Sequence, residues 1–430
     1  MRTQYKLVSA ERLSWVALAA IALLGPASSS LRAQTSTEFD RLRHAMVAQF
    51  IEKEGVRNPR VLEAMRTVPR QEFMPLKFRA KAYTDAAWSI GYKQTISPPF
   101  VVAYMTEVLD PQPSDRVLEV GTGSGYQAAV LSGLVKEVYS IEIVEPLGTA
   151  AATRLARMGY ANVKTKVGDG YLGWAEHAPF DKIIVTCSPE NVPKPLVQQL
   201  KEGGRMVIPL GERYHQDIYL LEKRQGKLFR KPLIPTLFVP MTGRSEKERI
   251  VKPDPLEPRI NNGGFELREA DGQPSGWHYQ RQLTLRQDHA PEGLSYAQFD
   301  NEDPGRVAQA LQGMAIDGRQ LVALKFKLMI RADRIVDGQE SYQKASLQVR
   351  YYDVERQPIG DAVGPPSWAG SFDWRSVSAT LPIPRGTNEA VVRIGLNGAT
   401  GRLCVDNIRM TPVKRSRSTL QPDFQPSRLP

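Results

Sequence analysis

The chain has 430 residues, 41% of them apolar and 24% charged, which excludes a disordered or fibrous protein and favours two globular domains over one. The formal net charge is +11, but Lys and Arg are scattered without a long basic run, so nucleic-acid binding is not indicated. A negatively charged cell envelope would explain the positive charge equally well.

Residues 1–33 are predicted to be a secretory signal peptide. Basic residues in the first twelve positions precede an apolar run from Trp15 to Leu24, and small residues follow at 27–30. This order is typical of export signals, and the apolar run is too short to cross a bilayer. We expect cleavage after Ala33 and export to the periplasm or cell envelope; an uncleaved anchor is the alternative.

The first domain, residues 34–244, is expected to begin with helices. Apolar residues recur at helical spacing from Phe39 to Glu54, and a second helix begins at Pro59. Ser97 precedes two prolines, which hold it in an extended or turn conformation and place its hydroxyl on a stiff backbone. A helix from Phe100 to Leu109 follows. The alternative role for Ser97 is to cap a turn.

The stretch from Arg116 to Gly125 is predicted to be a buried strand that ends in a glycine-rich turn, followed by a helix from Tyr126 to Leu134. Glycines at such a junction let a ligand approach the main chain closely. The dinucleotide-binding pattern would need a further glycine at the position of Tyr126. A carboxylate, Glu119, stands two residues before the first glycine and suits a cationic ligand better than a pyrophosphate.

Two more acids follow later strands. Glu142 closes the strand from Val138 to Ile141, at the distance where such folds place a carboxylate on ribose hydroxyls, and Asp169 follows the strand from Val163 to Val167. The sequence therefore predicts one pocket for S-adenosylmethionine, which carries a sulfonium and an ammonium group. The alternatives are an ordinary turn with surface acids, and Asp169 as a helix N-cap.

Strands and helices alternate in this domain, which predicts a parallel sheet with helices on both faces. Segments from Ile218 to Glu222 and from Leu233 to Val239 have no helix between them, so we expect an antiparallel pair at one sheet edge. Residues 245–259 are charged and proline-rich and are predicted to be a stiff linker.

Residues 260–412 are predicted to be an all-β sandwich, because short alternating segments follow one another without helices. Residues 413–430 are predicted to be a flexible tail. Five aromatic residues could form a sugar-stacking face, although packing in the core is favoured for them. They are Trp277, Tyr351, Tyr352, Trp368 and Trp374.

The chain contains two cysteines, Cys187 and Cys404, which lie in different predicted domains and are expected to be buried free thiols. There is no CxxC or HExxH motif among the two cysteines and five histidines, so no catalytic metal is expected. Glu266 and Asp406 could contribute to a structural calcium site, but the sequence does not assemble one.

From about Phe39 to Thr242 the chain resembles protein-L-isoaspartate O-methyltransferases. The segments that carry the resemblance are Arg60-Val61-Leu62-Glu63-Ala64-Met65, Val68-Pro69-Arg70, Gln94-Thr95-Ile96-Ser97-Pro98, Val117-Leu118-Glu119-Val120-Gly121-Thr122-Gly123-Ser124-Gly125-Tyr126, Gly168-Asp169-Gly170, Ala178-Pro179-Phe180-Asp181 and Ile183-Ile184-Val185-Thr186. The glycine motif alone indicates a class I methyltransferase, and the segment from Gln94 to Pro98 is the specific signal. Lys93 stands where the family commonly has glycine.

The resemblance implies a Rossmann-like, doubly wound α/β fold and methyl transfer from S-adenosylmethionine to L-isoaspartyl carboxylates of damaged proteins, which starts repair through a succinimide. It implies that Ser97 is the active-site hydroxyl. The cofactor-binding residues that it implies are Thr95, Ile96, Ser97, Glu119, Gly121, Gly123, Glu142, Asp169 and Gly170. Most of the family is cytoplasmic, which is the alternative to export.

Segments at both ends of the sandwich, Asn262 to Glu266 and Val405 to Ile408, resemble strands of carbohydrate-binding, galactose-binding-like jelly rolls. This resemblance implies a carbohydrate or another envelope ligand for the second domain. Two alternative functions remain for the whole chain: an exported methyltransferase acting on another carboxylate or a small molecule, and a non-enzymatic envelope-binding protein.

Overall fold

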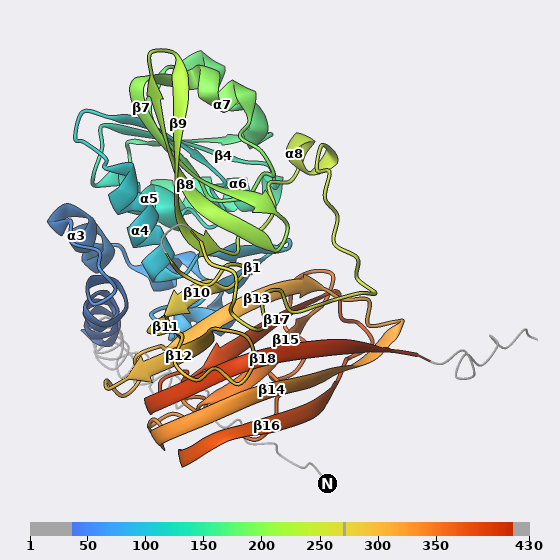
Figure 1. Ribbon diagram of the computed structural model, residues 1–430. Helices are drawn as coiled ribbons and strands as arrows, with labels where there is room; N and C mark the ends of the chain where they lie inside the picture. The colour runs from blue at the N-terminus through green and yellow to red at the C-terminus, as the bar shows by residue number, and fades with distance from the viewer. Residues whose placement is uncertain (1–36, 270–271, 416–430) are drawn as a thin grey trace, which may run out of the picture.

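The computed structural model describes residues 37–269 and 272–415 (Figure 1). The predicted signal peptide and residues 416–430 of the predicted tail lie outside the described residues. Within the described ranges, no helix is long and apolar enough to cross a membrane. The chain forms an α/β region followed by an all-β region, and this confirms the predicted fold class.

A seven-stranded sheet organises the α/β region, with the strand order β5-β4-β3-β6-β7-β8-β9. Neighbouring strands from β5 to β7 are parallel, whereas β8 and β9 are added antiparallel, so the predicted antiparallel edge is confirmed. The strands are β3 (Arg116–Val120), β4 (Glu137–Glu142), β5 (Val163–Val167), β6 (Phe180–Val185), β7 (Leu200–Glu212), β8 (His215–Arg224) and β9 (Lys227–Thr236).

Helices cover both faces of this sheet. One apolar core contains buried residues of α3, α4 and α5, and the other contains Leu196 of α7. The helix predicted from Phe39 to Glu54 is α-helical over residues 37–46 and continues as the π-helix η1. The helices are η1 (Val47–Glu52), α3 (Pro59–Thr67), η2 (Arg70–Phe73), η3 (Leu76–Lys81), α4 (Pro99–Leu109), α5 (Tyr126–Ser132), α6 (Glu145–Arg157), η4 (Gly170–Leu172), η5 (Ala175–His177), α7 (Lys194–Gln199) and α8 (Arg244–Lys247).

A two-stranded hairpin, β1 (Trp88–Gly91) and β2 (Gln94–Ile96), precedes α4. Tyr92 and Lys93 form its turn, with φ angles of 53° and 62°. Hairpin turns of two residues with positive φ favour glycine or asparagine, so Tyr92 and Lys93 hold a backbone conformation that disfavours their side chains. The hairpin leads directly to Ser97.

The second region consists of two antiparallel sheets. Their strand orders are β10-β13-β17-β15 and β11-β12-β18-β14-β16. Side chains of both sheets, such as Phe326 and Val349, belong to one apolar core, so the sheets form a sandwich. The strands are β10 (His278–Arg281), β11 (Leu283–Arg286), β12 (Tyr296–Asn301), β13 (Gln309–Ala315), β14 (Leu321–Val336), β15 (Ser346–Tyr352), β16 (Gly370–Pro382), β17 (Glu389–Gly395) and β18 (Thr400–Lys414).

Burial separates the aromatic residues that the sequence offers as a sugar-binding face. Trp277, Trp368 and Tyr351 are buried, which confirms the favoured interpretation that they pack in the core. Tyr352 and Trp374 are half-buried. Both cysteines are free, as expected; Cys404 is buried, whereas Cys187, which was also expected to be buried, is partly exposed.

Candidate active site

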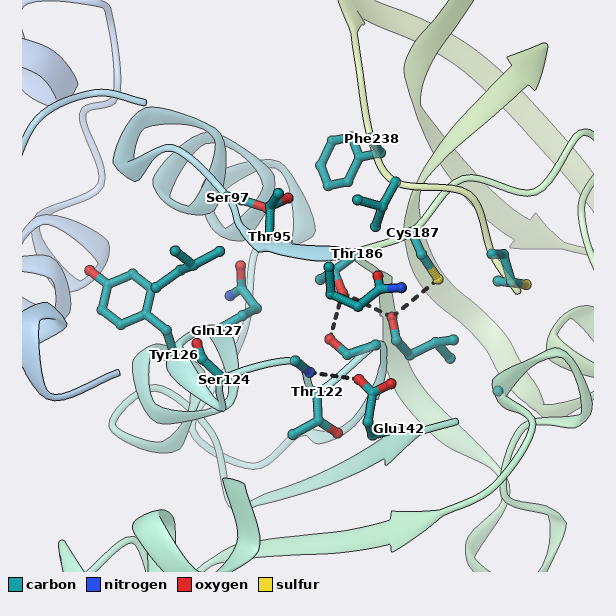
Figure 2. A pocket seen from close by; sticks show the side chains of 18 of the residues that line it. Thr95, Ser97, Thr122, Ser124, Tyr126, Gln127, Glu142, Thr186, Cys187 and Phe238 are labelled. Atoms are coloured by element: carbon teal, nitrogen blue, oxygen red, sulfur yellow. Dashed lines mark hydrogen bonds between the residues drawn. The ribbon is translucent and has the colours of Figure 1, made fainter. Parts of the chain in front are cut away.

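A pocket lies at the carboxyl ends of β3, β4 and β6, beside the hairpin strand β2 and Ser97, which follows it (Figure 2). Parallel sheets of this kind bind ligands at this edge. Seven of the nine residues that the sequence proposes for the site line the pocket. These are Thr95, Ile96, Ser97, Gly121, Gly123, Glu142 and Gly170.

In the glycine turn after β3, two physical reasons make glycine necessary at position 121. Its φ of 101° lies in the region that disfavours residues with a Cβ atom, and a Cβ there would stand 2.4 Å from Thr186 Oγ1. The Thr186 hydroxyl bonds to the carbonyl oxygens of Gly121 at 2.7 Å and Val120 at 3.1 Å. The main chain of the turn is therefore fixed against the end of β6, with its other side facing the pocket.

Glu142 holds the turn from the neighbouring strand. Its carboxylate accepts the backbone N–H groups of Gly123 at 2.8 Å and Val144 at 2.9 Å. Burial raises the pKa of Glu142, and these N–H groups oppose that rise. Figure 2 shows Glu142 and Ser97 on opposite sides of the pocket.

Glu119 lies behind the glycine turn and is absent from the pocket lining. It is fully buried within β3, and the Ser140 hydroxyl links it to the Thr122 hydroxyl. Burial raises the pKa of Glu119 to about 8, with Ser140 opposing the rise. Its Oε1 is buried and has no hydrogen-bond partner among the described residues.

Asp169 also lies outside the pocket lining. Its carboxylate accepts the backbone N–H of Tyr171 at 3.0 Å and that of Arg244 at 2.9 Å. The structure therefore shows Asp169 as the N-cap of η4, which is the alternative role that the sequence offered. Its neighbour Gly170 does line the pocket, and a Cβ at Gly170 would stand 2.4 Å from Val120 Cγ1.

Ser97 is held through its main chain. The Arg70 guanidinium donates to the Ser97 carbonyl at 2.6 Å, and three residues later the Phe100 N–H donates to Asp85 at 3.0 Å. The Ser97 hydroxyl makes no hydrogen bond to another described residue, and α4 has no side-chain cap. The turn-capping role is thus not realised, and the hydroxyl is free to bind a ligand.

Several pocket residues were not predicted from the sequence. Thr186 and Cys187 follow the end of β6, so the rule that ligands bind at strand ends could have found them. Phe238 and Met241 follow the last strand, and no local pattern marks them; the chain returns to the pocket because Met241 N–H bonds to the Ser188 carbonyl at 2.9 Å. Burial raises the pKa of the Cys187 thiol, so it is neutral.

The described residues contain no group of three or more His, Cys, Asp or Glu side chains that could hold a metal ion. In the second domain Glu266 accepts the backbone N–H groups of Leu294 and Ser295, and Asp406 accepts those of Glu292 and Asn407. These carboxylates therefore bond to main-chain donors of the sandwich.

Residues 41–246 match the family model of protein-L-isoaspartate(D-aspartate) O-methyltransferases. A protein-L-isoaspartate O-methyltransferase 2 of Syntrophobacter fumaroxidans is 53% identical over 188 residues, which are 43% of this chain and 76% of that protein. A second relative, protein-L-isoaspartate O-methyltransferase 2 of Shewanella sediminis, is 49% identical over 214 residues, which are 50% of this chain and 88% of that protein.

Among solved structures, a putative Plasmodium falciparum protein-L-isoaspartate O-methyltransferase in complex with S-adenosyl-L-homocysteine is 24% identical with a TM-score of 0.41. The similarity covers 46% of this chain and 98% of that one. The two bacterial relatives share about half of their residues with this chain over most of their own length. The chain therefore belongs to the protein-L-isoaspartate O-methyltransferase family.

Proposed function

We propose that this protein transfers a methyl group from S-adenosylmethionine to the carboxylate of L-isoaspartyl residues in damaged proteins and peptides. Family membership supports the reaction, and the free hydroxyl of Ser97 in the lining of a pocket that also contains Gly121 and Gly123 is the observation that carries it. Methylation turns the carboxylate into an ester with a good leaving group. The neighbouring backbone nitrogen then attacks the ester carbonyl and expels methanol to close a succinimide, which water reopens partly to normal aspartate.

The pocket residues fit the cofactor, which supplies an electrophilic methyl group on its sulfonium when bound. Glu142 lines the pocket with a carboxylate that no described cation pairs, and Glu119 keeps one buried oxygen without a partner. We assign the ribose hydroxyls to Glu142 and the adenine side to Gly170, next to Asp169. Thr95, Ile96 and Ser97 would close the opposite wall, and Gly121 and Gly123 the floor.

The residues present suit a carboxylate nucleophile. A substrate carboxylate is ionised near pH 7, so the transfer needs no general base. Ser97 donates one hydrogen bond that orients this carboxylate, while the apolar side chains of Met105, Phe238 and Met241 exclude water. Alignment and dehydration then supply most of the rate enhancement.

The experiment that tests this function compares two peptides that differ only in L-isoaspartate or normal aspartate at one position. With methyl-labelled S-adenosylmethionine, we expect base-labile label on the isoaspartyl peptide alone. Ser97→Ala should lower kcat about tenfold, the value of one lost hydrogen bond to a charged group, and leave cofactor affinity within about threefold. Ser378→Ala, exposed on β16, is the control.

Each other outcome selects an alternative. Equal labelling of both peptides would remove the isoaspartyl specificity. Cofactor binding without labelling of either peptide would point to another carboxylate or a small molecule. If isothermal titration detected no cofactor binding, the non-enzymatic role would replace the enzymatic one.

We also propose that the protein is exported. The order of basic, apolar and small residues in positions 1–33 supports this location. Expression of the full chain followed by fractionation should give a protein that begins at Gln34 in the periplasm or envelope. An intact protein that begins at Met1 in the cytoplasm would contradict export, and an intact protein in the membrane would favour the uncleaved anchor.

A carbohydrate is our proposed ligand for the second domain. A hollow on the five-stranded sheet combines the half-buried ring of Phe372 with Arg331, Asp333 and Arg402. Aromatic rings beside charged hydrogen-bonding groups are suited to sugars. Trp374 stands next to Arg331, its ring centre 5.1 Å from the guanidinium, and its Nε1 has no partner among the described residues.

Native affinity electrophoresis in gels containing one soluble polysaccharide each would test this proposal. Retardation of the wild-type protein in at least one gel, reduced in Phe372→Ala, is the expected result. Ser378→Ala on the same strand is the control. Equal mobility of wild type and Phe372→Ala in every gel would contradict the site.

A further inference from the structure

The second domain contacts the segment that carries Ser97. β10 of the sandwich contacts β9 of the α/β region (Figure 1). The loop before β16 and the strand β10 both send side chains to residues 85–100. The family match ends at residue 246, so these side chains lie outside the matched catalytic region.

Arg281, at the end of β10, is the most deeply placed of these side chains. Only 8% of its surface is exposed. Its guanidinium lies 3.9 Å above the centre of the Phe100 ring, and its nitrogens are 3.8 Å from carboxylate oxygens of both Asp85 and Glu54. A cation from the sandwich is therefore buried in the methyltransferase domain, at the start of α4.

These contacts lead to Ser97 in two steps. Asp85 accepts the N–H of Phe100 at 3.0 Å, which fixes the first turn of α4, three residues after Ser97. Burial raises the pKa of Asp85, and the charge of Arg281 opposes that rise, so the guanidinium favours the ionised carboxylate that accepts this bond. Arg281 also covers the Phe100 ring and so limits its movement.

A second set of contacts holds the hairpin. Gln357 donates to the Ser89 hydroxyl at 2.6 Å and accepts from Lys77 at 3.3 Å. Glu355 lies 3.5 Å from the ammonium of Lys93 at the hairpin turn. Residues of the sandwich thus touch both the strand before Ser97 and the helix after it.

We propose that Arg281 is a positioning residue for Ser97, so that the second domain completes the active site of the methyltransferase domain. The part of this inference that concerns turnover rests on the proposed function, because Ser97 is placed there on the substrate. The part that concerns the ordering of the Ser97 segment by Arg281 does not rest on the proposed function.

Arg306 provides a matched control at the same interface. It donates two hydrogen bonds to Glu54, at 3.0 and 3.1 Å, and is also a residue of the sandwich. No contact joins Arg306 to Asp85 or Phe100 among the described residues. A change that merely loosens the domain interface should therefore have similar effects at both arginines, whereas loss of positioning is specific to Arg281.

The experiment compares Arg281→Met, Arg281→Lys and Arg306→Met in the full chain. It measures hydrogen exchange of the peptide that spans residues 98–104, kcat with the isoaspartyl peptide, cofactor affinity and thermal stability. Arg281→Met should accelerate exchange at Phe100 about tenfold and lower kcat about tenfold, with cofactor affinity within about twofold. Arg281→Lys should restore part of the protection from exchange and part of kcat, because its ammonium keeps a positive charge beside Asp85. Arg306→Met should lower stability alone.

Equal changes of exchange and kcat in Arg281→Met and Arg306→Met would overturn the proposal, and so would an unchanged exchange rate in Arg281→Met. If the wild-type protein did not methylate the peptide, the proposed function would fail by itself. The exchange rates would still decide whether Arg281 orders the Ser97 segment.

Discussion

The pocket and the domain interface both bury carboxylates, but they neutralise them differently. Glu142 in the pocket wall bonds to backbone N–H groups, and Glu119 behind the glycine turn bonds to the Ser140 hydroxyl; neither forms an ion pair within the described ranges. At the interface, Glu54 lies between Arg281 and Arg306. The difference teaches that the pocket leaves the Glu142 carboxylate without a protein cation and so available to a cationic ligand, whereas the interface uses its carboxylates to hold the domains together.

At the other end of the interface, a buried carboxylate is again paired with groups of the protein itself. Glu389 of the sandwich is 7% exposed and accepts from Arg356 at 2.9 Å and from the Tyr214 hydroxyl at 2.8 Å. Burial and the charge of Glu389 raise the pKa of Tyr214, so the hydroxyl stays protonated and continues to donate. Both interface carboxylates are therefore fully used by the protein itself.

Removing the charge of Glu54 should have the largest effect on stability. Glu54→Gln leaves the guanidinium groups of Arg281 and Arg306 with less opposing charge in a buried interface, which costs about 3 kcal/mol of unfolding free energy. Urea unfolding followed by fluorescence measures this change. Glu63→Gln, on the exposed face of α3, should change the free energy by less than about 0.5 kcal/mol. Similar values for both variants would contradict the role given to Glu54.

Adding a methyl group to the glycine turn is the next largest change. Gly121→Ala combines an unfavourable φ of 101° with a Cβ only 2.4 Å from Thr186 Oγ1, which should cost about 2 kcal/mol and weaken cofactor binding more than tenfold. Gly133→Ala is the matched control, since its φ is −75° and a Cβ there would meet no atom within 4 Å. Isothermal titration with the cofactor distinguishes the two; equal affinities would show that the turn can relax.

The sequence predicts the floor of the pocket well, because one short segment contains both the strand and its glycines. Gly121 and Gly123 were expected in the site and line the pocket. Their role in cofactor binding stays a prediction. The depth of a carboxylate within a sheet is not a local property, so the sequence could not show that Glu119 lies behind the turn. Asp169 was assigned to the pocket from its strand end, although its oxygens bond to main-chain N–H groups of η4 and α8.

Contacts between distant segments were also beyond the reach of the sequence. Phe238 lines the pocket only because the chain returns there after β9. Arg281 reaches Asp85 across 196 positions of the chain, and no spacing or motif relates the two residues. Sequence patterns report which face of an element is buried, whereas partners of this kind depend on how the two domains pack.

Glu119 gives a prediction that depends on pH. Its pKa is about 8 in the folded protein, against about 4.3 in an unfolded chain. At pH values between these two pKa values, the folded protein binds more protons than the unfolded chain. The free energy of unfolding therefore falls as pH rises, by up to about 1.4 kcal/mol per pH unit. Glu119→Gln has no proton to lose and should remove this part of the slope.

Urea unfolding of wild type and Glu119→Gln between pH 5 and pH 9 measures the difference. The variant should gain stability relative to wild type as pH rises through this window. Parallel pH profiles would show that Glu119 is ionised in the folded protein, and the pocket would then carry two negative charges near neutral pH.

The smallest effect is expected at an ion pair that crosses the same interface but remains in water. Lys53 lies 2.8 Å from Asp303 of the sandwich, next to Glu54 in the chain, and both side chains are about half exposed. Because water screens such a pair, Lys53→Met should change the unfolding free energy by no more than about 0.5 kcal/mol, although its distance is shorter than those of the Arg281 contacts. A loss as large as that in Glu54→Gln would mean that proximity rather than burial decides the strength of this interface, and the contrast between its buried and exposed charges would fail.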